Sequence, residues 1–141
     1  MSVLVIGTSV ALKWVVCETG TDAALSLRSP ANLIAPELLL ADCADILCKK
    51  VARGELTSDE ALLAAHLLQA SGVEFVSTRA LLEAAMLIAF DLDRSARDCV
   101  YVALAAARNC RFVTADMQLV RTAREAAHGA WADRVISLQE V

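Results

Sequence analysis

The residues best suited to chemistry in this sequence are two aspartates that enclose the segment DCVYVALAAARNCRFVTAD, Asp98 and Asp116. The apolar run over residues 98–108 predicts a buried helix that rises about 15 Å. Asn109 predicts the turn that follows, because Asn tolerates the left-handed conformation that ends helices. A strand over residues 111–114 would then return about 13 Å. We therefore expect Asp98 and Asp116 to meet at one edge of a sheet.

A third carboxylate, Asp42, lies in the segment ELLLADCADILC, which predicts a helix that is apolar on almost every side. Burying an unpaired carboxylate costs several kcal/mol, and Lys49 and Lys50 are about two helical turns away. This favours a metal-binding or catalytic role. The alternatives are that Asp42 faces solvent or binds a backbone amide. Asp45, one turn further on, either supports such a site or is solvated.

Asp98 and Asp116 also have structural alternatives. A carboxylate near a helix N-terminus is stabilised by the helix dipole, and Asp is a good N-cap for the helix expected after Asp116. Three carboxylates at one edge are nevertheless the hard-oxygen ligands that Mg²⁺ and Mn²⁺ prefer. Four basic side chains are weaker candidates for phosphate contacts near that edge, with solvent exposure as the default: Lys13, Arg94, Arg97 and Arg121.

The elements that position these residues alternate between strands and helices. The apolar patterns predict strands at residues 2–6, 33–35, 73–77, 111–114 and 135–138. They predict helices at residues 8–16, 21–27, 36–53, 57–71, 79–92, 98–108 and 117–128. This alternation is typical of an α/β fold, a three-layer α/β/α sandwich with a central parallel sheet, in one domain over residues 1–141. Ligands of such sheets bind beyond the C-terminal ends of the strands.

Local signals predict where several of these helices begin and end. Thr8 or Ser9 would cap the first helix, and Pro36 would be the first residue of the third. The remaining signals are a capping box from Thr57 to Glu60, a break at Ser29 and Pro30, and glycine stops at Gly54, Gly72 and Gly129.

The composition excludes several classes of protein. Hydrophobic residues make up 57% of the chain and the mean hydropathy is +0.54, yet the longest charge-free runs, 1–12 and 61–73, are shorter than the roughly 18 residues of a membrane span. The first run also lacks the basic leader of a signal peptide. We expect no membrane association, and we expect the surplus apolar surface to be buried in a dimer or against a partner.

Charge and cysteine content narrow the choice further. The net charge is −4 and the isoelectric point about 5.1, which argues against a general nucleic-acid coat. The five cysteines include no C-x-x-C pair and only His66 and His128 could join them as soft ligands. This pattern indicates reduced cysteines in the cytoplasm rather than disulfides or a zinc site. The sequence has no Gly-rich phosphate loop and no G-x-S-x-G motif.

Three parts of the chain form a further pattern: VLVIGTSVALKW, APELLLADCADILCKK, and SARDCVYVALA followed by FVTAD. Together they resemble the PIN domain family, and within it the VapC-type toxins of bacterial toxin–antitoxin pairs. The resemblance implies a parallel sheet between helices and an endoribonuclease that depends on Mg²⁺ or Mn²⁺. It also implies a homodimer and a cognate VapB-type antitoxin, through which alone the complex binds DNA.

The same resemblance assigns site residues. Asp42 takes a helix position where Glu is commoner, and Asp98 and Asp116 take the two later acidic positions. Three hydroxyl residues match positions that flank the metal: Thr8, Ser9 and Thr114. Gly7 stands where the family has an aspartate, so the site lacks one carboxylate and cleavage should be weaker.

Two main hypotheses follow. The first is a toxin that hydrolyses RNA phosphodiesters with Mg²⁺ or Mn²⁺, leaving 3′-hydroxyl and 5′-phosphate ends, with activity reduced by Gly7. The second is a catalytically inactive PIN scaffold that acts through antitoxin binding and a DNA-bound repressor complex. A nuclease of 5′-flap type is less favoured, because the chain has no room for a clamp over DNA.

Overall fold

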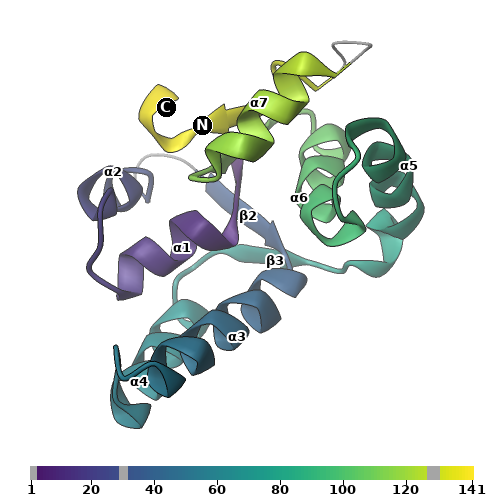
Figure 1. Cartoon of the computed structure of the whole chain (residues 1–141). Helices are drawn as coiled ribbons and strands as arrows, with labels where there is room; N and C mark the ends of the chain where they lie inside the picture. The colour runs from purple at the N-terminus through teal and green to yellow at the C-terminus, as the bar shows by residue number, and fades with distance from the viewer. Residues whose placement is uncertain (1–2, 29–31, 127–130) are drawn as a thin grey trace.

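The computed structural model describes residues 3–28, 32–126 and 131–141, and a five-stranded parallel sheet forms its centre (Figure 1). The strands lie in the order β3-β2-β1-β4-β5. Their bounds are β1 Val3–Ile6, β2 Asn32–Pro36, β3 Glu74–Val76, β4 Arg111–Thr114 and β5 Val135–Ser137. The strands are short and apolar, as expected of parallel strands that are covered on both faces.

Helices cover both faces of this sheet. Figure 1 shows α5 and α6 on one side of the strands and α1 and α2 on the other. The helix bounds are α1 Thr8–Val15, α2 Thr21–Ser26, α3 Leu38–Ala52, α4 Ser58–Gln69, α5 Leu82–Leu92, α6 Ala96–Ala107 and α7 Met117–Glu125. Two 3-10 turns, Arg79–Leu81 and Leu138–Glu140, complete the described elements. The predicted α/β/α sandwich with a parallel sheet is confirmed.

The strand order defines where a ligand can enter. β1 pairs with β2 on one side and with β4 on the other, so that Val5 lies beside both Ile34 and Phe112. The chain therefore winds away from β1 in both directions. In open parallel sheets this reversal opens a crevice beyond the C-terminal ends of the two central strands. Gly7 follows β1 and Asp116 lies just past β4, so both residues face this crevice.

Helix α6 is the most deeply buried helix of the fold. Every residue from Cys99 to Ala105 is buried, and the helix packs against β1, β2 and β4. A helix that is apolar all round belongs in the core. Because α6 is fixed on several sides, the side chains at its N-terminal end are held firmly over the crevice.

Several predicted boundaries are confirmed. The capping box is present, since the Thr57 hydroxyl accepts from the Glu60 amide and the Glu60 carboxylate accepts from the Thr57 amide. Asn109 has a φ of 50°, and Gly54 and Gly72 also have positive φ. Gly54 and Asn109 directly follow the C-caps of α3 and α6 and so end these helices, whereas Gly72 follows the C-cap of α4 by two residues.

Two predicted boundaries are wrong. Pro36 is the last residue of β2 rather than the first of a helix, because β2 pairs with β3 as far as Pro36 and Val76. Neither Thr8 nor Ser9 caps α1, whose N-cap is Gly7. The Gly7 carbonyl instead accepts from the amides of Val10 and Ala11.

Some predictions lie outside the described residues or end earlier than expected. The break at Ser29 and Pro30, the stop at Gly129, and the positions of Ser2 and His128 are outside the described ranges. Helix α7 ends at Glu125. Among the helices that the structure describes, none combines the length and the apolar character needed to cross a membrane.

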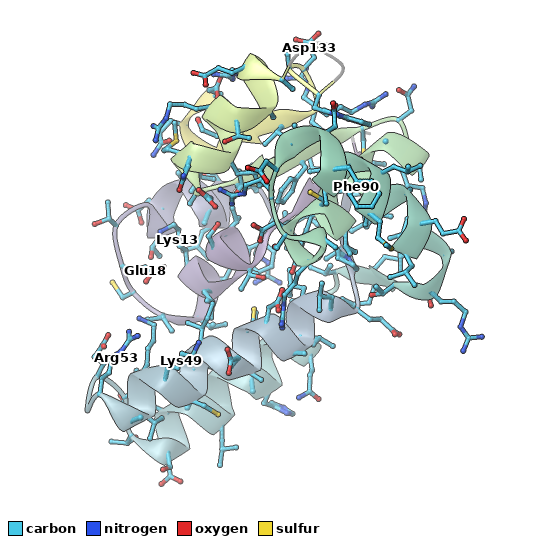
Figure 2. The ribbon with its side chains drawn as sticks, turned by 45° about the vertical axis from the view of Figure 1, so that its right-hand side comes forward. Lys13, Glu18, Lys49, Arg53, Phe90 and Asp133 are labelled. Carbon is cyan, nitrogen blue, oxygen red and sulfur yellow. The ribbon has the colours of Figure 1, made fainter. Side chains whose placement is uncertain are left out.

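Two helices carry apolar side chains on their outer surfaces. Phe90 of α5, labelled in Figure 2, is 74% exposed. The other large exposed apolar residues of α4 and α5 are Leu62, Leu63, Leu67, Leu82, Met86 and Leu87. Large exposed apolar patches on proteins often mark surfaces that bind another molecule.

Candidate active site

The crevice beyond β1 and β4 is a pocket of about 400 Å³, and all of the predicted site residues line it. The three carboxylates come from different elements: Asp42 from α3, Asp98 from α6 and Asp116 from the start of α7. The pocket also contains the three predicted hydroxyl residues and the glycine at the end of β1: Thr8, Ser9, Thr114 and Gly7. The fold therefore gathers these residues in one place.

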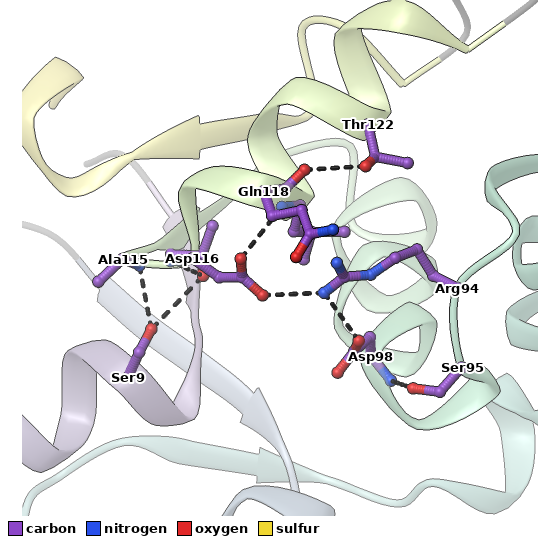
Figure 3. A network of polar contacts seen from close by, with 10 residues as sticks. Ser9, Arg94, Ser95, Asp98, Ala115, Asp116, Gln118 and Thr122 are labelled. Carbon is purple, nitrogen blue, oxygen red and sulfur yellow. Dashed lines mark hydrogen bonds and ion pairs between the residues drawn. The ribbon is translucent and has the colours of Figure 1, made fainter.

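Arg94 bridges two of the carboxylates, as Figure 3 shows. Its Nη2 atom lies 2.9 Å from Oδ2 of Asp98 and 2.8 Å from Oδ2 of Asp116. The Arg94 side chain is 16% exposed. Burial disfavours its charge, but the hydrogen bond to Asp116 and the charges of both carboxylates outweigh burial and raise the Arg94 pKa. A positive charge therefore already lies between Asp98 and Asp116.

The Nε atom of Arg94 is buried and has no hydrogen-bond partner among the described residues. Leaving a buried donor unsatisfied costs about 1–3 kcal/mol. Both carboxylates thus accept a hydrogen bond from Arg94, whereas one donor of the guanidinium group, Nε, has no acceptor in the described part of the chain.

The backbone around Asp116 is held by hydroxyl groups (Figure 3). The Ser9 hydroxyl accepts from the Ala115 amide at 3.0 Å, and the Thr114 hydroxyl accepts from the Asp116 amide at 3.0 Å. Oδ1 of Asp116 accepts from the Leu119 amide at 3.1 Å and so caps α7. The structural alternative for Asp116 therefore holds, and its second oxygen still faces the pocket.

Asp98 lies near the start of its helix, as predicted, but α6 begins two residues earlier, at Ala96. The N-cap of α6 is Ser95, whose hydroxyl accepts from the Asp98 amide at 3.2 Å. Asp98 lies in the first turn of α6, where the helix dipole favours a negative charge. Its carboxylate is left free to bind Arg94.

Asp42 is paired, contrary to the expectation from its neighbours in sequence. Arg97, at the exposed start of α6, forms an ion pair with its Oδ1. The Tyr101 hydroxyl donates to its Oδ2 at 2.9 Å. The cation that pairs with Asp42 comes from another helix, α6, and not from the nearby Lys49 or Lys50. The Asp42 side chain is 14% exposed, so these two partners make its burial tolerable.

Tyr101 links Asp42 to the start of α1. Its hydroxyl lies 2.8 Å from that of Thr8, and since its one hydrogen goes to Asp42, Thr8 donates to Tyr101. Burial raises the Tyr101 pKa well above its ordinary value. Tyr101 therefore remains a neutral donor, and it fixes the direction in which the Asp42 carboxylate points. Sequence reasoning missed this residue, although it is the one polar side chain within the buried run of α6.

Gly7 leaves space that an aromatic ring fills. A Cβ atom at Gly7 would lie 2.9 Å from Cε1 of Phe112, a contact that requires the ring to move. Phe112 is buried and stacks on Tyr101 with 5.3 Å between ring centroids. The backbone of Gly7 is extended, with φ of −92°, so only the ring opposes a side chain here.

Two of the remaining charged candidates, Lys13 and Asp45, have other partners. Lys13 pairs with Glu18, and both are labelled in Figure 2. Asp45 pairs with Lys49 on the exposed side of α3, although it reaches the rim of the pocket. Arg121 is exposed.

All five cysteines are free, and burial raises the pKa of the Cys43 thiol to about 12 and that of Cys99 to about 11.

The sequence pattern that defines the PIN domain family matches residues 4–125 of this chain. The chain belongs to the PIN domain family. No curated protein shows significant similarity to it. The recognition of a PIN domain from the sequence is therefore confirmed, and the match includes all the residues of the pocket.

Three solved structures share the fold of this PIN domain. PAE2754 from Pyrobaculum aerophilum has a TM-score of 0.72 and 14% identity, covering 99% of this chain and 85% of its own. VapBC2 from Rickettsia felis, bound to a DNA fragment from its promoter, has a TM-score of 0.64 and 13% identity over 96% and 98%. Mycobacterium tuberculosis VapC20, a toxin that cleaves the sarcin–ricin loop, has a TM-score of 0.62 and 16% identity over 77% and 85%.

A divalent metal, which PIN domains generally require, suits the pair Asp98 and Asp116. Both offer carboxylate oxygens, the ligands that Mg²⁺ and Mn²⁺ prefer, and both already accept from one positive group. In the described part of the chain, no three Asp, Glu, His or Cys side chains form a group that could hold a metal ion. The predicted metal ligands Asp42, Asp98 and Asp116 line the same pocket, and their joint binding of a metal stays a prediction.

Proposed function

We propose that this PIN domain is a VapC-type toxin that hydrolyses RNA phosphodiesters with Mg²⁺ or Mn²⁺. The observation that carries the proposal is the convergence of Asp42, Asp98 and Asp116 in the crevice between β1 and β4. Family membership supports a nuclease, and the fold shared with a toxin that cleaves the sarcin–ricin loop supports RNA as the substrate.

In this proposal the pocket residues have separate roles in the reaction. Asp98 and Asp116 would hold the metal, which when bound polarises the scissile phosphate and lowers the pKa of the attacking water. Tyr101 and Thr8 orient Asp42, so that its carboxylate can accept the proton that the water loses. Arg97, whose side chain is 57% exposed, can exchange Asp42 for a phosphate oxygen of the RNA.

Gly7 is the reason to expect slow cleavage. We propose that it replaces the first acidic residue of the family site, so that one metal ligand is missing. Mg²⁺ retains several waters in many proteins, and water can take the place of the absent carboxylate. The cost is a less firmly held metal and therefore a lower rate.

The test compares metal-dependent cleavage of a structured RNA by the wild-type chain, Asp98→Asn and the double variant Gly7→Asp/Phe112→Leu. The second substitution makes room for the new carboxylate. We expect slow cleavage by the wild type, none by Asp98→Asn or with EDTA, and at least about tenfold faster cleavage by the double variant. If the double variant fails to cleave and Asp98→Asn changes nothing, the nuclease assignment is wrong.

A second candidate function is a catalytically inactive scaffold that binds a VapB-type antitoxin and joins a DNA-bound repressor complex. The exposed apolar residues of α4 and α5 support it, as does the structural likeness to a VapBC complex bound to promoter DNA. Calorimetry with Mn²⁺ separates the two functions. No binding at millimolar Mn²⁺ favours the scaffold, whereas binding that is lost in Asp116→Asn favours the nuclease.

Under either function we propose a cytoplasmic protein that forms a homodimer. The free cysteines support a reducing compartment. The apolar outer face of α5 supports contact with a second copy, and DNA would be reached only through the antitoxin.

A further inference from the structure

We propose that Arg94 is a built-in competitor of the divalent ion: its guanidinium occupies the place between Asp98 and Asp116, and the metal must displace it to bind. This inference rests on the proposed function, since it concerns the same two carboxylates. It adds a residue that determines how strongly the site takes up its metal.

The geometry supports competition rather than simple proximity. A single nitrogen, Nη2, lies within hydrogen-bond distance of one oxygen from each carboxylate. Each of those oxygens therefore faces the position of that nitrogen, where a bridging cation would also lie. A guanidinium and a metal ion cannot occupy that position together.

Charge favours exchange in the presence of enough metal. Two carboxylates carry two negative charges, and the guanidinium neutralises only one of them. A divalent ion neutralises both, so it is the better partner once the guanidinium leaves. The side chains of Asp98 and Asp116 are 43% and 42% exposed, so a hydrated ion can reach them.

The hydrogen bonding of Arg94 suits an occupant that can be displaced. Its Nε is buried and has no partner in the described part of the chain. Arg134 is a useful contrast, because its two terminal nitrogens bond to the Cys110 carbonyl and the Asn109 side chain at the other edge of the sheet. Arg94 commits only one nitrogen, Nη2, to the two carboxylates.

The backbone on both sides of Arg94 holds this residue near the two carboxylates. Asp93 ends α5 in the left-handed conformation, with φ of 51°, and Ser95 caps α6. Arg94 is thus the single residue between two fixed positions. A competitor joined to the site by so short a connection acts at a high effective concentration, so it lowers metal affinity without needing strong contacts.

The experiment measures Mn²⁺ binding by calorimetry to the full chain and to Arg94→Ala. Removing a positive charge next to the metal should tighten Mn²⁺ binding by at least about tenfold. Arg94→Lys keeps the charge and should bind Mn²⁺ like the wild type, within about threefold. If the alanine variant does not fold, Arg94→Met keeps the apolar stem and gives the same comparison.

Two further variants locate the effect. Arg111→Ala removes an exposed positive charge at the opposite end of β4 and should change Mn²⁺ affinity by less than about twofold. Adding Asp116→Asn to Arg94→Ala should abolish the gain. Equal measurable affinities for wild type and Arg94→Ala overturn the role of Arg94 and leave the nuclease proposal standing. No Mn²⁺ binding by either protein overturns the metal site itself, on which both proposals rest.

Discussion

Gly7 and Phe112 form a coupled pair at the residue scale. The Gly7 amide donates to the Val113 carbonyl, which extends the pairing of β1 with β4 past Ile6. This bond holds Gly7 beside β4, where the Phe112 ring fills the space that a side chain would need. A carboxylate cannot be restored at this position without repacking the ring against Tyr101.

This coupling predicts the stability of substitutions at Gly7. Gly7→Ala should destabilise the fold by about 1–3 kcal/mol, because the added methyl group overpacks the site. Gly7→Asp should cost at least as much, and Phe112→Leu should recover part of that cost. We expect a coupling energy of at least about 0.5 kcal/mol in a double-mutant cycle measured by urea denaturation. Strictly additive effects would show that the ring is not the obstacle.

The sequence predicts the acidic residues of the pocket but not their partners. Asp98 and Asp116 follow from one helix and one returning strand, so local geometry is enough to bring them together. Arg97 meets Asp42 across 55 residues of sequence, and Thr8 meets Tyr101 across 93. Such contacts depend on how α1, α3 and α6 pack in three dimensions, which no local pattern encodes.

At the scale of elements, α3 and α4 act as a pair. They pack against each other, and α3 carries Asp42 into the pocket. The start of α4 is fixed by the capping box of Thr57 and Glu60. The stability of α4 therefore contributes to the position of Asp42, although no residue of α4 lines the pocket.

Removing the cap should destabilise the protein without touching the pocket. Thr57→Ala should lower the free energy of unfolding by about 0.5–2 kcal/mol, because the Glu60 amide loses its acceptor, and Thr57→Ser should be close to wild type. The Thr57 amide lowers the Glu60 pKa. The Glu60 contribution is therefore present above the ordinary carboxyl pKa and is lost as the pH falls through its lowered value.

Urea titrations at neutral and acid pH check this prediction. The difference between wild type and Glu60→Gln should shrink as the pH falls, while the effect of Thr57→Ala on the hydroxyl bond persists. A Thr57→Ala protein as stable as Thr57→Ser would contradict the assigned role of the cap.

Element types were more predictable than element boundaries. Short apolar runs predicted all five strands of the described sheet, because strands of a parallel sheet are largely covered on both faces. Pro36 was misplaced because its preference for the first turn of a helix is a local one. Pairing of β2 with β3, and the bond from the Glu37 amide to the Val76 carbonyl, extend the strand through Pro36.

At the scale of the whole molecule, apolar surface is unevenly distributed. The outer face of α5 carries Leu82, Met86, Leu87 and Phe90, all exposed. The inner face of the same helix packs on α6. Helix α5 thus has one face packed in the fold and one apolar face exposed.

This distribution predicts a dimer that depends on α5. Light scattering coupled to size-exclusion chromatography should give the mass of a dimer for the wild type and that of a monomer for Phe90→Glu. Leu25→Glu, at an exposed apolar residue of α2, serves as the matched control and should remain dimeric. A monomeric wild type, or a Phe90→Glu protein of unchanged mass, would contradict the assignment.

Tyr101 is the only tyrosine of the chain, and it lies inside the pocket between Thr8 and Asp42. Because burial raises its pKa, the phenol stays un-ionised in the folded protein at a pH near 10, where an exposed tyrosine would ionise. Tyrosinate absorbance and the ring resonances of an isotope-labelled sample therefore report on this pocket alone. The fold supplies its own spectroscopic probe, one hydrogen bond away from a candidate catalytic carboxylate.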